Sequence, residues 1–126
     1  MGKGYLIDSN AIIDFFNGSL PEKGRNLLFS VEPCISIITF IEVFSNNKAD
    51  SKEVNSLKKF SEMAKIYIVD HKIAFVTIEL RKKYKIKLPD ALIASTALFY
   101  DFILITRNIS DFGKIVGLQT INPHDI

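Results

Sequence analysis

Short apolar runs rich in β-branched residues alternate along this chain with longer segments that have helical hydrophobic spacing. Such runs suit strands that are buried on both faces, and their alternation with helices is typical of a parallel sheet covered on both sides. Strands are expected at 5–7, 34–37, 66–69, 102–105 and 118–121. Helices are expected at 10–16, 21–29, 39–44, 50–64, 72–84 and 88–99, with a polar loop and turn at 106–112. The pattern therefore predicts a three-layer α/β/α fold with a mostly parallel sheet of four to five strands.

Length and composition limit the class of protein further. The 126 residues suffice for one compact domain but not comfortably for two, so 1–126 is expected to be a single domain. The single cysteine, Cys34, excludes an internal disulfide framework and a paired-cysteine zinc site. No apolar run approaches the ~20 residues of a membrane helix, and the first strand begins too early to leave room for a signal peptide. We expect a soluble, cytoplasmic protein without a membrane partner.

Carboxylates occur where the predicted strands end. Asp8 follows the first strand, Glu42 lies early in the helix after the second, and Asp111 lies in the loop after the fourth. In a doubly wound parallel sheet these three points converge on one edge. Carboxylates brought together repel one another, and a divalent cation removes that cost. A site of oxygen ligands alone suits Mg²⁺ or Mn²⁺ better than Zn²⁺.

Each acidic residue also has a purely structural interpretation. Asp8 could cap the following helix, and Thr39 and Glu42 have the spacing of a capping box. Asp90 lies in the first turn of a helix, where negative charge suits the macrodipole. Asp111 lies in a segment of typical turn composition. Asp90 does not follow a clear strand, so the convergence argument does not include it.

The chain resembles the PIN-domain ribonucleases, in particular the VapC-type toxins of toxin–antitoxin pairs, in four segments: LIDSN at 6–10, IEV at 41–43, LPDALIA at 88–94 and ITRNISDF at 105–112. The resemblance runs from about residue 5 to 123, and its last two segments are the most specific. It implies that four acids hold Mg²⁺ or Mn²⁺ for the hydrolysis of RNA by metal-activated water: Asp8, Glu42, Asp90 and Asp111.

The resemblance also suggests roles for polar residues beside these acids. Ser9 stands where the family commonly has Thr, so a hydroxyl is kept. Ser9, Thr106 and Asn108 are expected to orient a carboxylate or a metal-bound water, with ordinary turn and cap bonding as an equal alternative. His71 and His124 are interpreted as incidental surface or helix-end residues, because this chemistry needs no histidine.

Basic residues precede or flank the acidic segments. Arg81, Lys82, Lys85 and Lys87 lie in a basic stretch that leads into the Asp90 segment, and Arg107 adjoins the last acidic segment. They are candidates for binding RNA phosphates, with a solvated helix end as the alternative for the basic stretch.

The early helices are rich in large apolar side chains, which exceed what a small core needs: Phe15, Phe16, Leu27, Leu28, Phe29, Phe40, Phe44 and Phe60. The excess leaves room for an apolar groove or a dimer face. Family resemblance suggests both a homodimer and a cognate antitoxin segment that lies across these helices and reaches the acidic site.

Two other functions fit parts of the pattern. Asp70 is expected to cap the helix at 72–84. A phosphoryl-receiver domain would use the same alternation, with Asp70 as acceptor, but Asp8 has no second acid beside it and no Lys follows the last strand. A non-catalytic PIN-like binding module is the second alternative, and the full set of four acids argues against it.

Overall fold

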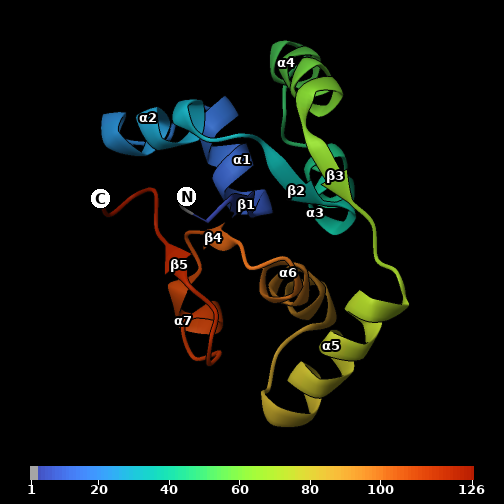
Figure 1. Ribbon diagram of the computed structural model, residues 1–126. Helices are drawn as coiled ribbons and strands as arrows, with labels where there is room; N and C mark the ends of the chain where they lie inside the picture. Colours follow the sequence, from blue (N-terminus) through green and yellow to red (C-terminus); the bar gives the residue numbers. More distant parts are fainter. Residues whose placement is uncertain (1–2) are drawn as a thin grey trace.

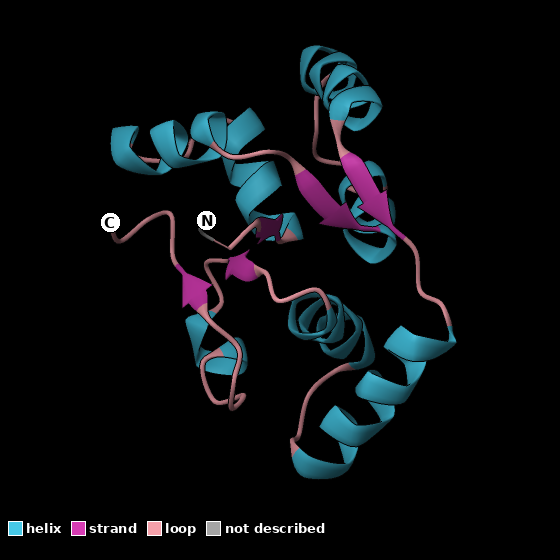
Figure 2. Ribbon diagram, viewed as in Figure 1, coloured by secondary structure: helices cyan, strands magenta, loops and turns pink. Residues whose placement is uncertain are grey.

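The computed structural model describes residues 3–126. Its strands form one sheet in the order β3-β2-β1-β4-β5, and every neighbouring pair is parallel (Figures 1 and 2). The strands are β1 (Tyr5–Ile7), β2 (Cys34–Ser36), β3 (Lys65–Tyr67), β4 (Ile103–Ile105) and β5 (Thr120–Ile121). The predicted three-layer fold with a parallel sheet is confirmed, although most strands are shorter than expected.

Helices lie on both faces of this sheet. The helices are α1 (Ser9–Phe16), α2 (Glu22–Ser30), α3 (Ile37–Phe44), α4 (Ser51–Met63), α5 (His71–Lys83), α6 (Leu88–Phe99) and α7 (Ile109–Phe112). Helices α1, α2 and α4 contribute to the core on one face, whereas α5, α6 and α7 contribute to the core on the other (Figure 1). Helix α3 contacts α1, α4 and α6. No helix within residues 3–126 has the length and apolar character needed to cross a membrane.

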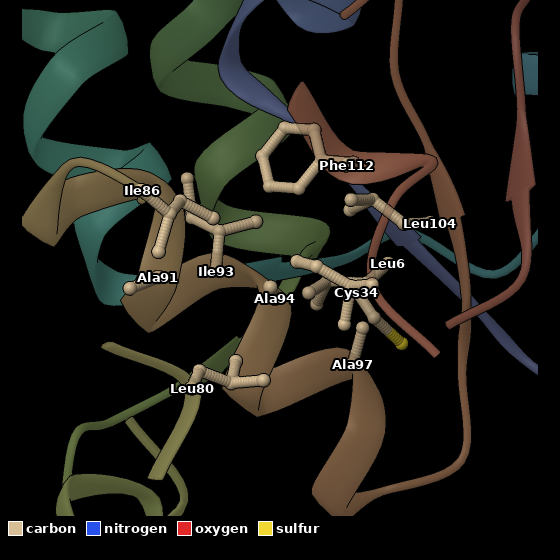
Figure 3. Packing of buried hydrophobic residues seen from close by; sticks show 11 residues of the cluster. Leu6, Cys34, Leu80, Ile86, Ala91, Ile93, Ala94, Ala97, Leu104 and Phe112 are labelled. Atoms are coloured by element: carbon tan, nitrogen blue, oxygen red, sulfur yellow. The ribbon is translucent and has the colours of Figure 1, made fainter. Parts of the chain in front are cut away.

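Two hydrophobic clusters hold the layers together because successive strand residues point to opposite faces. Leu6 pairs with Leu104, and both side chains pack with α6 and with Phe112 of α7 (Figure 3). Ile7 pairs with Ile105, and both belong to the opposite cluster. All five side chains are at most 1 % exposed. This register places the residues that follow β1 and β4 beside each other at the edge of the sheet.

The helix starts follow from side-chain caps. Asp70 accepts a hydrogen bond from Ile73 N at 3.0 Å, so its predicted role as the cap of α5 is confirmed. The capping box predicted for Thr39 and Glu42 is wrong. Helix α3 begins earlier than expected, because Ser36 at the end of β2 serves as the cap and accepts from Ile38 N at 3.1 Å. Thr39 therefore lies inside the helix, fully buried.

The segment after β4 contains a short helix. Residues 106–112 were expected to form a loop and turn, but Ile109–Phe112 form the short helix α7, anchored by the buried Phe112. The last residues return to α2, where a Cβ on Gly24 would stand 2.0 Å from the carbonyl oxygen of Pro123. Only a glycine permits this approach of the C-terminal segment to α2.

Candidate active site

Asp8 lies where β1 ends and α1 begins, and only 4 % of it is exposed. Its Oδ1 accepts from Ser9 N at 2.8 Å, and its Oδ2 accepts from Asn10 Nδ2 at 3.0 Å and from Thr106 Oγ1 at 2.8 Å. Burial raises the pKa of Asp8 to about 6, against the effect of the Thr106 and Ser9 hydrogen bonds. Asp8 is therefore both the cap of α1 and a carboxylate whose charge is poorly compensated.

The charges that act on Asp8 come from α3 and α6. Asp90, in the first turn of α6, and Glu42 of α3 both raise its pKa further. The pKa of Asp90 itself is raised by burial and then by the negative charges of Glu42 and Asp111, while Lys87 lowers it. Asp90 follows no predicted strand, yet α6 brings it to the other acids.

A pocket of about 260 Å³ lies between these elements. Three of the four predicted acids line it together with Ser9, Asn10, Ile13, Asp14 and Arg107: Asp8, Glu42 and Asp90. Within the pocket, Ser9 Oγ donates to Glu42 Oε1 at 2.5 Å. The carboxyl end of β1, the N-terminal turns of α1 and α6 and the last turn of α3 thus meet at this pocket.

The fourth predicted acid, Asp111, does not line the pocket. It is exposed on α7, where its Oδ2 accepts from Asn108 Nδ2 at 2.9 Å. Asn108 is itself tied to β4, since its backbone N donates to Thr106 Oγ1 at 3.0 Å. Asp111 is near enough to act on the pKa of Asp90, so it flanks the pocket rather than forming it.

The donors of this site suit a hard divalent cation by chemistry. Within the described chain no three Asp, Glu, His or Cys side chains are grouped closely enough to ligate one ion. Mg²⁺ usually needs only one or two carboxylates and completes its shell with water and substrate phosphate. Asp8 and Asp90 offer two carboxylates whose raised pKa values reflect burial and uncompensated negative charge. A cation would relieve both effects.

Three residues that were not predicted as part of the site belong to its hydrogen-bond network. Asn10 joins two loops, because its Nδ2 donates to Asp8 while its Oδ1 accepts from Arg107 N at 3.1 Å. Asp14, with 5 % exposed, accepts from Arg107 Nη1 at 3.0 and 3.2 Å and lies 2.8 Å from His124 Nε2. The interpretation of His124 as incidental is therefore wrong, whereas His71 does begin α5.

Comparison with known proteins gives the family. A model of the PIN domain matches residues 5–117, most of the chain. The chain belongs to the PIN-domain family. This PIN domain is similar to a chain of a toxin–antitoxin complex from Klebsiella pneumoniae, with a TM-score of 0.80 and 35 % identity over 98 % of this chain and 100 % of that one.

Two further solved structures show the same likeness. VapBC2 from Rickettsia felis, bound to a DNA fragment from its promoter, has a TM-score of 0.78 and 27 % identity over 94 % of the PIN domain and 97 % of that chain. DNA-bound VapBC from Salmonella typhimurium has a TM-score of 0.76 and 25 % identity over 97 % and 99 %. A search of the curated proteins finds no match. The resemblance to VapC-type PIN domains that the motifs indicated is confirmed.

The sheet order separates this PIN domain from a phosphoryl receiver. Receivers of the flavodoxin-like type have the strand order 2-1-3-4-5, whereas the order here is β3-β2-β1-β4-β5. Asp70, the acceptor in that alternative, follows the edge strand β3 and caps α5. The receiver interpretation is therefore dropped.

The predicted basic residues differ in their distance from the acids. Lys87 precedes α6 and acts on the pKa of Asp90, and Arg107 lines the pocket. Arg81 and Lys82 are exposed in the last turn of α5, where Lys82 Nζ lies 3.6 Å from Glu79. Lys85 accepts a hydrogen bond at its backbone oxygen from Lys114 Nζ at 2.7 Å, and its own side chain does not line the pocket.

The PIN domain also carries an apolar groove of about 410 Å³ where α1, α2 and α4 meet. Most of its lining is aromatic or aliphatic, and includes Phe15, Phe16, Leu28, Phe29, Phe60 and Met63. Phe29 and Met63 are 71 % and 73 % exposed. The groove takes up four phenylalanines of the early helices, whereas Phe40 and Phe44 of α3 pack against each other outside it, with tilted rings.

Proposed function

We propose that this PIN domain is a metal-dependent endoribonuclease and the toxin of a toxin–antitoxin pair that acts on RNA in the cytoplasm. The observation that carries the proposal is the pocket that Asp8, Glu42 and Asp90 line together beside the carboxyl end of β1. Burial and mutual repulsion raise the pKa values of two of these carboxylates. A structural role gives no reason for three acids to share one pocket, whereas acids that bind a divalent cation for phosphodiester hydrolysis must lie close together.

Mg²⁺ or Mn²⁺ is the proposed cofactor, with Asp8 and Asp90 as its main ligands and Glu42 and Asp111 as further acids. Such an ion supplies Lewis acidity that activates water and neutralises charge on the phosphate. The chain contributes a fixed arrangement of oxygens, because Ser9 and Thr106 hold the acids by hydrogen bonds before any ligand arrives. Asn108 does the same for Asp111.

Cations of the chain contribute the affinity for the polyanionic substrate. Lys87 lies beside Asp90, and Arg107 lies at the pocket itself. Arg81, Lys82 and Lys85 extend this positive charge along the end of α5 and the following loop. RNA phosphates would be attracted along this stretch toward the acids, with little dependence on base sequence.

The proposal is tested by cleavage of a labelled single-stranded RNA in EDTA, in Mg²⁺ and in Mn²⁺. The parent protein should cleave only with a cation, and Asp90→Asn should reduce the rate by at least about a hundredfold. Asp101→Asn is the matched control, because Asp101 is an exposed acid before β4, at the strand end remote from the pocket. Equal cleavage by the parent and Asp90→Asn would refute the site, and no cleavage by the pure parent would favour a binding module.

An antitoxin is the proposed protein partner, and the apolar groove between α1, α2 and α4 is its proposed binding site. Two structural relatives carry the name VapBC and a third is a toxin–antitoxin complex. An amphipathic segment suits a groove of this lining. The product of a small neighbouring reading frame, co-expressed with the parent, should co-purify with it. Phe29→Glu should abolish this co-purification, because Phe29 lines the groove and is largely exposed.

A homodimer is proposed to form through α5. Phe75 and Ile78 of that helix are 68 % and 47 % exposed, on a helix that does not line the groove. Light scattering should show that Phe75→Glu shifts the protein to a monomer while co-purification of the antitoxin persists. The two glutamate variants thus serve as each other's control. A parent that is monomeric at all concentrations would contradict the dimer.

A further inference from the structure

Arg107 is anchored at only one end of its guanidinium group. Nη1 donates to both oxygens of Asp14, at 3.2 Å to Oδ1 and 3.0 Å to Oδ2. Among residues 3–126 the guanidinium group makes no other hydrogen bond, so the N–H groups of Nε and Nη2 are free to bind a ligand. The side chain is 57 % exposed and lines the acidic pocket. Arg107 thus presents free donors in a planar fork at the edge of the site.

The partner of Arg107 is unusual for its location. Asp14 lies in the apolar stretch of α1, and its side chain is only 7 % exposed. A buried carboxylate is costly unless it is paired, and an apolar residue would pack there at less cost. A second group also reaches Asp14, since His124 Nε2 lies 2.8 Å from Oδ2. The C-terminal segment delivers His124 because Pro123 packs against Gly24 of α2.

This anchoring has a consequence for the acids. Asp8 and Asp90 line the same pocket as Arg107, and an unrestrained guanidinium group would be drawn onto them. Such a contact would place a permanent cation on the proposed metal ligands. The backbone N of Arg107 donates to Asn10 Oδ1, and Asp14 accepts from the side chain of Arg107, so both parts of the residue are held in place. The guanidinium group is therefore held at the side of the pocket.

We propose that Arg107 binds a phosphate of the substrate beside the acids and that Asp14, buried beneath it, is the residue that positions it. This inference rests on the proposed function in taking RNA as the ligand. A half-anchored arginine fork can donate two parallel hydrogen bonds to a phosphate, which a lysine cannot. His124 belongs to the support of Asp14 and does not touch the substrate.

The test is RNA affinity by fluorescence anisotropy with a labelled single-stranded oligonucleotide, in EDTA and across a salt series. All proteins carry Asp90→Asn, so that the RNA stays intact. Arg107→Ala should weaken binding about tenfold and reduce the slope of log affinity against log salt by about 0.7, the value for one phosphate contact on a single strand. Arg107→Lys should keep most of the slope and still lose several-fold in affinity, because the charge remains and the fork is lost.

The role of Asp14 is isolated by a double-variant cycle. Asp14→Asn should weaken binding in the arginine background and have no further effect in the Arg107→Ala background. Lys23→Ala on α2 is the charge-matched control, because Lys23 is exposed and α2 does not line the acidic pocket. Urea denaturation of each variant checks that the fold persists under the conditions of the binding assay.

The outcomes separate this inference from the nuclease proposal. If Arg107→Ala binds with the background affinity and slope, Arg107 has only a structural role. If Asp14→Asn weakens binding equally without Arg107, Asp14 does not act through it. If the background protein binds no RNA at low salt, RNA is the wrong ligand. If RNA binds as predicted but the protein without Asp90→Asn never cleaves it, the nuclease proposal fails and the phosphate contact stands.

Discussion

Thr106 donates a hydrogen bond from Oγ1 to Asp8 Oδ2 at 2.8 Å across 98 positions of the sequence. The contact exists because β1 and β4 are in register, with Ile7 opposite Ile105, so the next residue on each strand meets its counterpart. Thr106 is fully buried and also accepts from Asn108 N at 3.0 Å. One hydroxyl therefore fixes an acid of the pocket and the loop that carries Asp111.

Removing this hydroxyl should shift the pH dependence of the site. The Thr106 hydrogen bond lowers the pKa of Asp8, so Thr106→Val should raise that pKa further. Metal-dependent cleavage should then require a higher pH, with roughly tenfold loss near pH 6.5 and less loss near pH 8.5. Rates across pH for the parent, Thr106→Val and Thr106→Ser measure this. A profile that falls equally at all pH values would mean that Thr106 acts through the loop alone.

In the metal-free protein, Asp8 should contribute more to the free energy of unfolding in mild acid than at neutral pH. Its pKa rises from 3.8 to about 6 on folding, so the protonated form is favoured in the folded state. This contribution, about 3 kcal/mol in full, is present below the unfolded pKa and is lost as pH rises through about 6. Urea denaturation in EDTA at pH 5 and pH 7.5 tests it, with Asp8→Asn as the variant that should lack this part of the pH dependence.

Stabilisation of the protein by Mg²⁺ should increase with pH, opposite to the contribution of Asp8 in the metal-free protein. Protons compete with the cation for Asp8, so the increase in melting temperature on adding Mg²⁺ should be larger at pH 7.5 than at pH 5. Thermal denaturation with Mg²⁺ and with EDTA at the two pH values provides the comparison. Equal stabilisation at both would show that the cation binds elsewhere.

Loss of the side-chain hydroxyl should have opposite effects on the free energy of unfolding at Ser36 and at Thr39. Ser36→Ala removes the cap of α3 and should cost about 1 kcal/mol of unfolding free energy. Thr39 Oγ1 is buried with no hydrogen-bond partner among the described residues, so Thr39→Val should be neutral or stabilising by up to about 1 kcal/mol. Urea denaturation measures both. A clearly destabilising Thr39→Val would contradict this expectation and would mean that the buried hydroxyl contributes to stability.

Gly24→Ala should loosen the C-terminal segment. The new Cβ would stand 2.0 Å from the oxygen of Pro123, so the segment must move or α2 must shift, at a cost of about 1–3 kcal/mol. Because this segment carries His124 to Asp14, hydrogen exchange should rise around 122–126. Gly18→Ala is the comparison, since Gly18 has open space but a φ of +82°, so it should destabilise without affecting the C-terminal segment.

The sequence predicted the fold well because strand and helix periods are local properties. Asp70 was recognised as a cap from its neighbours alone, and the structure agrees. Thr39 was misjudged because Ser36 sits directly between β2 and α3, leaving no loop for a later start. The helical character of Ile109–Phe112 depends on the burial of Phe112, which a polar stretch of sequence does not reveal.

The candidate site was only partly predictable for a physical reason. Asp8 and Glu42 could be brought together by the rule for parallel strand ends. Asp14 could not, because Arg107 reaches it through the pairing of β4 with β1, and His124 reaches it through the packing of the C-terminal segment against α2. One sign was visible in the sequence, since Asp14 is the only charged residue in α1, whose remaining residues are mostly apolar.

If Asp8 binds the divalent cation that RNA cleavage requires, the initial rate of cleavage must depend both on the Mn²⁺ concentration and on the charge of Asp8. Asp8→Asn keeps a side chain of the same shape at the start of α1 and removes the charge. The rate of the parent protein should rise with Mn²⁺ and saturate, whereas Asp8→Asn should stay at least about a hundredfold slower with its melting transition retained. A folded Asp8→Asn protein that cleaves like the parent would show that the charge of Asp8 is not needed to bind a catalytic cation.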